Sequence, residues 1–176
     1  MPDRLLSTLL LALCLGVTGP GRAAPAFRAT VISVGDGDSL RVRRGDQRIT
    51  IRLACIDAPE RSQSPWGEWA WQALRRRLPI GLPLTVAPRS RDRYGRTVAE
   101  VISGSSIGLA QVEAGLAFVD HRHLGACDVR SYLDAEARAR RRRLGVWTLP
   151  QGVTRPWDYR REQRLGRSHG RQFRSD

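Results

Sequence analysis

The feature that most constrains this chain is a run of three short β-type segments joined by two tight turns. The segments are residues 27–34, 39–44 and 47–56, and each alternates apolar with polar side chains, as a strand with one buried face does. The turns are Gly35-Asp36-Gly37-Asp38 and Gly45-Asp46, whose glycines permit a tight reversal. Because Pro59 has no N–H to donate to a ladder, the sequence predicts a meander that ends at Asp57-Ala58-Pro59-Glu60.

The rest of the chain alternates helices with strands. Pro65 favours a helix start, and Gly115 and Gly145 favour helix ends. We expect helices over residues 66–78, 106–114 and 129–144, and two further strands over residues 82–87 and 97–102. Five short strands with interspersed helices predict an α+β fold, a five-stranded Greek-key barrel of the oligonucleotide-binding (OB-fold) type with about three helices.

The N-terminus has the pattern of a secretory signal peptide. The apolar run over residues 5–17 is too short for a membrane span, which needs about 20 residues, but typical of a signal-peptide core. Ala24-Pro25-Ala26 supplies small residues, so we expect cleavage after Ala26. Leu13 is too bulky for the position before a lipid-modified Cys14. The sequence therefore predicts a signal peptide over residues 1–26 and a secreted or periplasmic protein.

The charge of the chain is strongly positive. It contains 30 basic residues, all of them arginine, against 17 acidic residues, for a formal net charge of +13. Such an excess implies a polyanionic partner such as nucleic acid, acidic polysaccharide or a membrane surface. A hydrophobic content of 41% is enough for a packed core. We expect one domain over residues 27–149, followed by a basic C-terminal tail over 150–176 that is mostly disordered beyond Tyr159.

Three polar clusters are candidates for chemistry. They are Asp36 with Asp38, Arg52 with Asp57 and Glu60, and the Asp92-Arg93-Tyr94-Gly95-Arg96 turn. Each one alone has an ordinary structural explanation, because aspartate beside glycine or before Ala-Pro is common in turns and arginine is abundant throughout this chain. In this order and spacing, however, the three clusters resemble the staphylococcal nuclease-like (thermonuclease) family. The resemblance covers about residues 28–147, including LAQVEAG at 109–115 and LGVW at 144–147.

The resemblance implies a calcium site and a general base. Asp38 and Asp57 correspond to the two calcium-binding carboxylates of the family, and Ala58 to the residue whose backbone carbonyl completes the site. Glu60 corresponds to the general base. Calcium takes six to eight oxygen ligands, so two carboxylates and a carbonyl leave room for waters and a phosphate oxygen.

The resemblance also implies a set of phosphate-binding residues. Arg52 and Arg96 correspond to the two arginines that bind the phosphate under attack, where a planar guanidinium can donate paired hydrogen bonds to oxygens that gain charge. Arg93 and Tyr94 match positions that help to hold a terminal phosphate. The nucleotide-stacking tyrosine of the family has no clear counterpart, and Phe118 is the nearest aromatic residue.

The function implied by the resemblance is that of a secreted, calcium-dependent nuclease. It would hydrolyse phosphodiester bonds of both DNA and RNA, leave 3′-phosphate ends, and act as a monomer without stable membrane association. A non-catalytic nucleic-acid-binding barrel is the alternative, but such a module would be expected to have lost part of the catalytic set. A cationic membrane-active protein is a third possibility, and the sequence lacks the broad amphipathic helix that it would need.

The remaining expectation concerns the cysteines. Once the signal peptide is removed, Cys55 and Cys127 are left, and two cysteines in an oxidising compartment are more often paired than free. In the family's barrel the loop before the last helix should pass close to the end of the third strand, so the resemblance makes a disulfide between them plausible. The alternative is a buried apolar Cys55 and a free thiol at Cys127.

Overall fold

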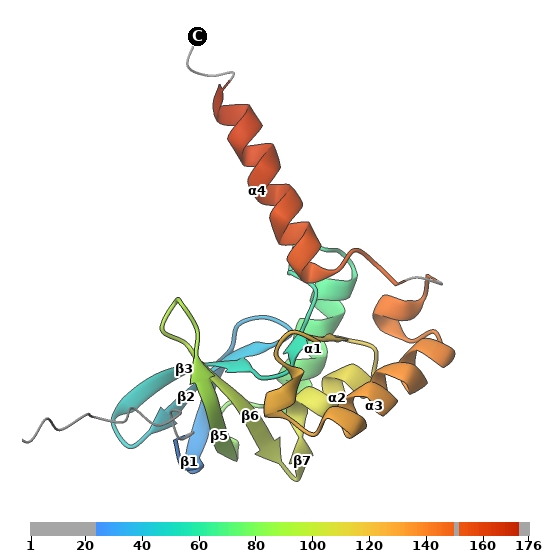
Figure 1. Ribbon diagram of the computed structural model, residues 1–176. Helices are drawn as coiled ribbons and strands as arrows, with labels where there is room; N and C mark the ends of the chain where they lie inside the picture. Colours follow the sequence, from blue (N-terminus) through green and yellow to red (C-terminus); the bar gives the residue numbers. More distant parts are fainter. Residues whose placement is uncertain (1–23, 150–151, 173–176) are drawn as a thin grey trace, which may run out of the picture.

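The protein is described by a computed structural model that covers residues 24–149 and 152–172 (Figure 1). The predicted signal peptide lies almost wholly outside these residues. Five strands form a closed barrel with the order β3-β2-β1-β5-β6, and a parallel pairing between β3 and β6 closes it. The barrel is the predicted five-stranded one. Its strands are β1 (Phe27–Val34), β2 (Ser39–Arg44), β3 (Gln47–Leu53), β5 (Pro83–Arg91) and β6 (Thr97–Ser103), and the short β7 (Ser105–Ser106) pairs with the end of β6.

The barrel interior is built from the alternating apolar positions of these strands. In β2, Leu40 and Val42 are buried while Arg41 and Arg43 are exposed, because consecutive side chains of a strand point to opposite faces. The antiparallel register pairs Leu40 with Ile51, which is also fully buried. The barrel core therefore follows directly from the period-two pattern of the sequence.

The third strand is shorter than predicted. It ends at Leu53 instead of Ile56, because Cys55 has a φ of 67°, a left-handed conformation that interrupts a ladder. The chain turns at Ala54-Cys55 and resumes as β4 (Ile56–Asp57), which pairs with β8 (Phe118–Val119) in a separate two-stranded sheet. This break turns Asp57 away from the barrel ladder.

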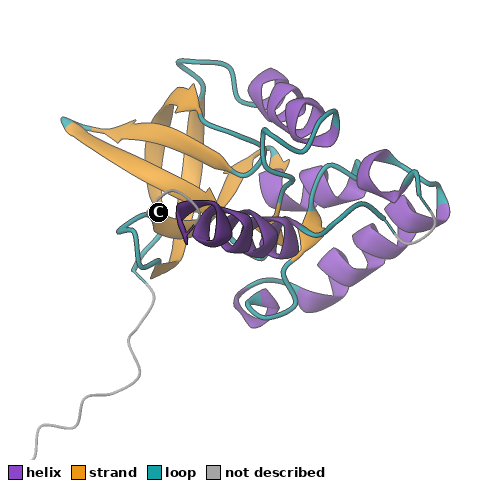
Figure 2. Cartoon of the chain, turned by 90° about the horizontal axis from the view of Figure 1, so that it is seen from above, coloured by secondary structure: helices purple, strands orange, loops and turns teal. Residues whose placement is uncertain are grey.

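The helices pack on one side of the barrel (Figure 2). The three predicted helices are present as α1 (Trp66–Arg77), α2 (Ile107–Glu113) and α3 (Val129–Arg141), with short 3₁₀ turns η1 (Leu124–Ala126) and η2 (Gly145–Trp147). The Ser106 hydroxyl accepts a hydrogen bond from the Leu109 N–H at 3.4 Å and caps α2. The Asp128 carboxylate caps α3 by accepting from the Ser131 N–H at 3.2 Å.

The C-terminal segment differs from the expectation of a mostly disordered tail. A fourth helix, α4 (Pro156–Gln172), extends away from the body of the protein (Figure 1). Its first turn is anchored, because the Trp157 ring packs edge-on against Phe118 with centroids 6.3 Å apart. The Arg155 guanidinium lies 4.1 Å from the Phe118 ring centroid and 4.6 Å from that of Trp147. The start of α4 thus packs on the aromatic rings of the domain, although its sequence shows no periodic apolar pattern.

The structure contains the predicted disulfide between Cys55 and Cys127, whose Cα atoms are 6.4 Å apart. It joins the turn between β3 and β4 to the residue that follows η1, two positions before α3. The bond therefore links the strand that leads into Asp57 to the helical side of the molecule.

We predict that the double substitution of Cys55 and Cys127 by serine lowers the free energy of unfolding by about 2–4 kcal/mol, because the cross-link closes a long loop in the unfolded chain. Urea denaturation of the variant and of the wild type measures the loss. Reductant should reproduce it in the wild type and have no effect on the variant. A wild-type protein with the same free energy of unfolding in the presence and absence of reductant would contradict the prediction.

Candidate active site

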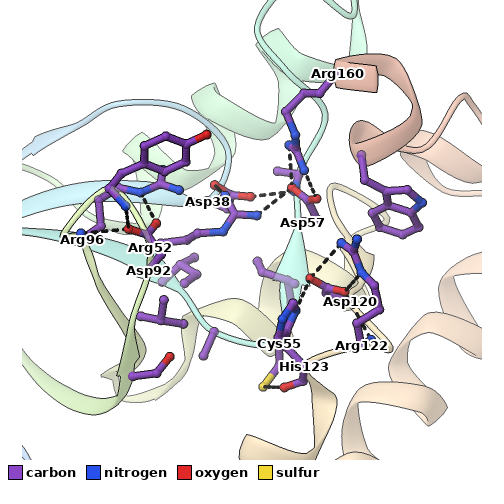
Figure 3. Close-up of a pocket in the computed structure, with 18 of the residues that line it drawn as sticks. Asp38, Arg52, Cys55, Asp57, Asp92, Arg96, Asp120, Arg122, His123 and Arg160 are labelled. Carbon is purple, nitrogen blue, oxygen red and sulfur yellow. Dashed lines mark hydrogen bonds and ion pairs between the residues drawn. The ribbon is translucent and has the colours of Figure 1, made fainter. Parts of the chain in front are cut away.

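A cleft of about 1300 Å³ opens where the turn that precedes β2 meets the ends of β3 and β4. The β5–β6 hairpin forms one side of it, and the first turns of α4 form another. Seven carboxylates and nine arginines line it, so it is both acidic at its base and rich in guanidinium groups (Figure 3). The carboxylates are Asp36, Asp38, Asp57, Glu60, Asp92, Asp120 and Asp158, and the arginines are Arg52, Arg89, Arg91, Arg93, Arg96, Arg122, Arg160, Arg161 and Arg164.

Arg52 joins the two carboxylates predicted to bind calcium. Its Nη1 donates to Asp38 Oδ1 at 3.0 Å and its Nη2 donates to Asp57 Oδ1 at 2.8 Å. The side chains of Asp38 and Asp57 are only 4% and 1% exposed. The remaining oxygen of Asp38 accepts the backbone N–H of Ala58 at 2.9 Å. The structure thus brings together Asp38, Arg52, Asp57 and Ala58.

The electrostatics of this cluster follow from its burial. Burial raises the pKa of Asp38 to about 8, against the opposing influence of Arg52 and the Ala58 N–H. The charge of Asp38, followed by that of Asp57, raises the pKa of Arg52, although burial opposes the shift. Two ionised carboxylates that are buried close together repel each other and are stable only beside a positive charge. Arg52 supplies one such charge.

In the turn before Asp38, the backbone at Gly37 packs closely against the side chains of Ala58 and Ala70. A Cβ atom on Gly37 would lie 2.6 Å from the Cβ of Ala70 and 2.7 Å from that of Ala58, so only glycine fits without displacement. The buried side chain of Gln111 donates from Nε2 to the Gly37 carbonyl at 3.0 Å and to the Ala70 carbonyl at 3.1 Å. Helices α1 and α2 therefore fix the position from which Asp38 enters the cleft.

Glu60 lies in the loop between β4 and α1, and its backbone is fixed by Gln63. The Glu60 N–H donates to Gln63 Oε1 at 2.9 Å, while Gln63 Nε2 donates to the Thr154 carbonyl at 2.9 Å. The Glu60 side chain is 35% exposed, so its carboxylate reaches the cleft. Gln63 is a supporting residue that the sequence did not single out, since glutamine in a loop gives no distinctive signal.

Arg96 lies in the same cleft but is not part of the Asp38–Asp57 cluster. Its Nε donates to Asp92 Oδ2 at 2.6 Å, and Asp92 Oδ1 accepts the backbone N–H groups of Tyr94 and Arg96 (Figure 3). Tyr94 is 69% exposed at the tip of the hairpin, with the guanidinium of Arg93 4.9 Å from its ring centroid. Asp92 thus organises the hairpin that carries Arg93, Tyr94 and Arg96.

Phe118 does not reach the cleft. It is fully buried and packs edge-on against Trp147 with centroids 5.2 Å apart. A base cannot stack on it. Among the described residues, the aromatic side chains that do line the cleft are Tyr94 and Trp157.

Arg160 was not predicted as a site residue, but it extends from α4 to Asp57 (Figure 3) and also bonds Glu60. The only signal was the aromatic residues that precede it, Trp157 and Tyr159, which are unusual in a tail of glycine, proline and arginine.

The donor set of the cluster fits a hard cation. Within residues 24–149 and 152–172, no three His, Cys, Asp or Glu side chains are grouped as metal ligands. Asp38 and Asp57 share one guanidinium, however, so both present buried oxygen atoms to the same small region. Oxygen donors without nitrogen or sulfur suit calcium or magnesium better than zinc.

Comparison with known proteins decides the family. The sequence model described as "Staphylococcal nuclease homologue" matches residues 50–149. The chain belongs to the staphylococcal nuclease family. It is 34% identical over 145 residues to a micrococcal nuclease of Shigella flexneri, which covers 77% of this chain and 81% of the relative.

Two further relatives come from Escherichia coli. Protein ParB is 34% identical over 161 residues, 84% of this chain and 89% of that protein. An uncharacterized endonuclease is 35% identical over 132 residues, 74% of this chain and 82% of that protein. The family and these relatives make the chain a nuclease, a hydrolase that acts on nucleic acid.

We predict that Gly37→Ala lowers the free energy of unfolding by about 1–3 kcal/mol, because the added methyl group overpacks the contact with Ala58 and Ala70. Urea denaturation measures the change. Gly125→Ala is the matched control, since a Cβ there meets no atom within 4 Å, and it should stay within about 0.5 kcal/mol of the wild type. Similar values for the two variants would show that the turn is not tightly packed.

Proposed function

We propose that this nuclease is an exported, calcium-dependent enzyme that hydrolyses phosphodiester bonds of DNA and RNA and leaves 3′-phosphate ends. The observation that carries the proposal is the convergence of Asp38 and Asp57 on Arg52 at the base of an arginine-lined cleft. Buried acidic oxygens for a cation and guanidinium groups for a phosphate lie side by side there. The family supplies the nuclease activity, and the cluster supports its metal dependence.

Asp38, Asp57 and the backbone carbonyl of Ala58 are the residues that would hold the cation. Bound calcium would supply positive charge next to the phosphate, where attack by water adds a second negative charge. The two carboxylates are rigidly placed, Asp38 by Gly37 and the Ala58 N–H, and Asp57 by the turn at Cys55. Such preorganisation lowers the reorganisation needed when the substrate binds.

Arg52 and Arg96 are the proposed phosphate ligands. Both line the cleft, and each guanidinium retains N–H groups beyond those that bond the neighbouring aspartates. Donors that are already in place when charge develops on phosphate oxygens stabilise the transition state more than the ground state. Arg93 and Tyr94, at the tip of the β5–β6 hairpin, are proposed to hold a terminal phosphate.

Glu60 is the proposed general base. It lies three residues beyond Asp57, and Arg160 bonds both carboxylates, so the two side chains are close neighbours. A carboxylate beside the cation could remove a proton from an attacking water. The guanidinium groups that dominate the cleft bind phosphate, which is common to DNA and RNA, and this supports activity on both.

Export and a monomeric state complete the proposal. The apolar N-terminal run supports a signal peptide over residues 1–26, and the disulfide suits an oxidising compartment such as the periplasm or the exterior. In the part of the chain that the structure describes, no helix is both long enough and apolar enough to cross a membrane. One chain contributes all the proposed site residues, so no second subunit is needed to complete the cleft.

We predict that Glu60→Gln lowers the rate of plasmid and RNA cleavage by about 10²–10³-fold, because the amide cannot accept a proton. The matched control is Glu68→Gln on α1, whose carboxylate pairs with Arg61 and Gln72 outside the cleft, and it should keep the wild-type rate. Nucleic-acid binding by Glu60→Gln should persist. Full activity of this variant would remove Glu60 from the mechanism.

We also predict that calcium supports cleavage, that magnesium does so poorly, and that a chelator abolishes it. Magnesium needs a compact octahedron of ligands, whereas two carboxylates and a carbonyl form a looser, hydrated site. Rates measured with each metal at equal concentration test this. Full activity in chelator would contradict calcium dependence. Binding without cleavage under all conditions would favour the non-catalytic barrel instead.

A further inference from the structure

Arg160 contacts the active-site carboxylates from outside the motifs of the family. Its Nη1 donates to Asp57 Oδ1 at 3.1 Å, and its Nη2 donates to Asp57 Oδ2 at 2.5 Å. The same Nη1 also donates to Glu60 Oε1 at 2.6 Å. One guanidinium on α4 therefore bonds both oxygens of Asp57 (Figure 3) and links them to the proposed general base.

These contacts complete the set of hydrogen bonds to Asp57. Its Oδ1 accepts from Arg52 and Arg160, and its Oδ2 accepts from Arg160. A calcium ligand must place its oxygen 2.3–2.6 Å from the ion. An ion bound to Asp57 would then lie within a few ångströms of the Arg160 guanidinium. Two positive charges so close together repel each other strongly in a buried site. The ion and Arg160 would therefore compete for the same carboxylate.

The charge of the cluster supports this competition. Asp38, Asp57 and Glu60 carry three negative charges when ionised, and Arg52 and Arg160 balance two of them. Whatever the protonation of Asp38, the departure of Arg160 would remove one positive charge from this cluster. The remaining carboxylate charge would then attract a divalent ion more strongly.

Arg160 is held firmly but can leave. The helix that carries it is anchored by Trp157 against Phe118, so the start of α4 lies beside the cleft. The Arg160 side chain is 34% exposed, and it needs to cross no packed core to reach water. Burial disfavours the charged form of Arg160, but the hydrogen bonds that it donates to Asp57 and Glu60 outweigh burial and raise its pKa.

We propose that Arg160 is a positioning residue of the active site. It holds Asp57 and Glu60 in place when no divalent cation is bound, and it competes with that cation for Asp57. The inference rests on the proposed calcium site. It implies that the calcium concentration needed for activity is set partly by α4, a segment beyond the family match.

The experiment measures calcium affinity by isothermal titration calorimetry in the purified wild type, Arg160→Gln and Arg161→Gln. Arg161 is the matched control, since it removes one positive charge from the same helical turn but pairs with Asp158 at 3.0 Å instead of the carboxylate cluster. We expect Arg160→Gln to bind calcium about 5-fold more tightly or better, the lower end of usual coupling between two ligands. Arg161→Gln should match the wild type.

A second readout separates competition from a merely structural role. By linkage, Arg160→Gln should lower the thermal midpoint in chelator, and this loss should shrink or vanish in saturating calcium. An equal loss under both conditions, or equal calcium affinities in the wild type and Arg160→Gln, would overturn the proposal. If none of the proteins binds calcium while cleavage persists in chelator, the calcium part of the proposed function fails, and the competition fails with it.

Discussion

The half of this molecule that carries the cleft depends on the ion cluster in which Arg52 bridges Asp38 and Asp57. Both carboxylates are almost completely buried, and their hydrogen bonds come from guanidinium groups and one backbone N–H. Removing one partner from a buried ion cluster leaves uncompensated charge at a cost of about 3–5 kcal/mol. Arg52 therefore has two roles, as a proposed phosphate ligand and as the counter-ion that lets two acids share one site. Loss of activity on its substitution would not separate these roles.

The closed barrel places the two sides of the cleft together. Parallel pairing joins Arg52 of β3 to Val98 of β6, two residues after Arg96. The same pairing that closes the barrel thus brings the Asp92-to-Arg96 hairpin beside the carboxylates. The break at Cys55 interrupts a strand instead of pairing one. It takes Asp57 out of the barrel ladder and places it beside Asp38. Barrel closure and strand interruption are both needed for one site.

The sequence predicted those parts of the structure whose signals are local. The strands with alternating burial and the three helices are present where local signals placed them, although α3 ends at Arg141 instead of Leu144 and β5 continues to Arg91. The early end of β3 was missed because a left-handed cysteine has no signature in the sequence. Phe118 could not be placed because its burial depends on Trp147 and Trp157, distant in the chain. Arg160 was missed for the same reason, since 103 residues separate it from Asp57 and nothing in a basic tail marks one arginine among many.

The aromatic packing around Phe118 also bears on where this protein ends as a folding unit. The match to the family's sequence model ends at residue 149, but the apolar cluster of Phe118, Ala139, Val146 and Trp147 continues through Val153 and Trp157. A chain that ended at residue 149 would expose the rings of Phe118 and Trp147, which are now covered. This would leave an exposed apolar patch, a site of unwanted association, on a highly cationic protein. The folding unit defined by buried apolar contacts therefore extends past the end of the model match as far as Trp157, in the first turn of α4, and a fragment for study should include it.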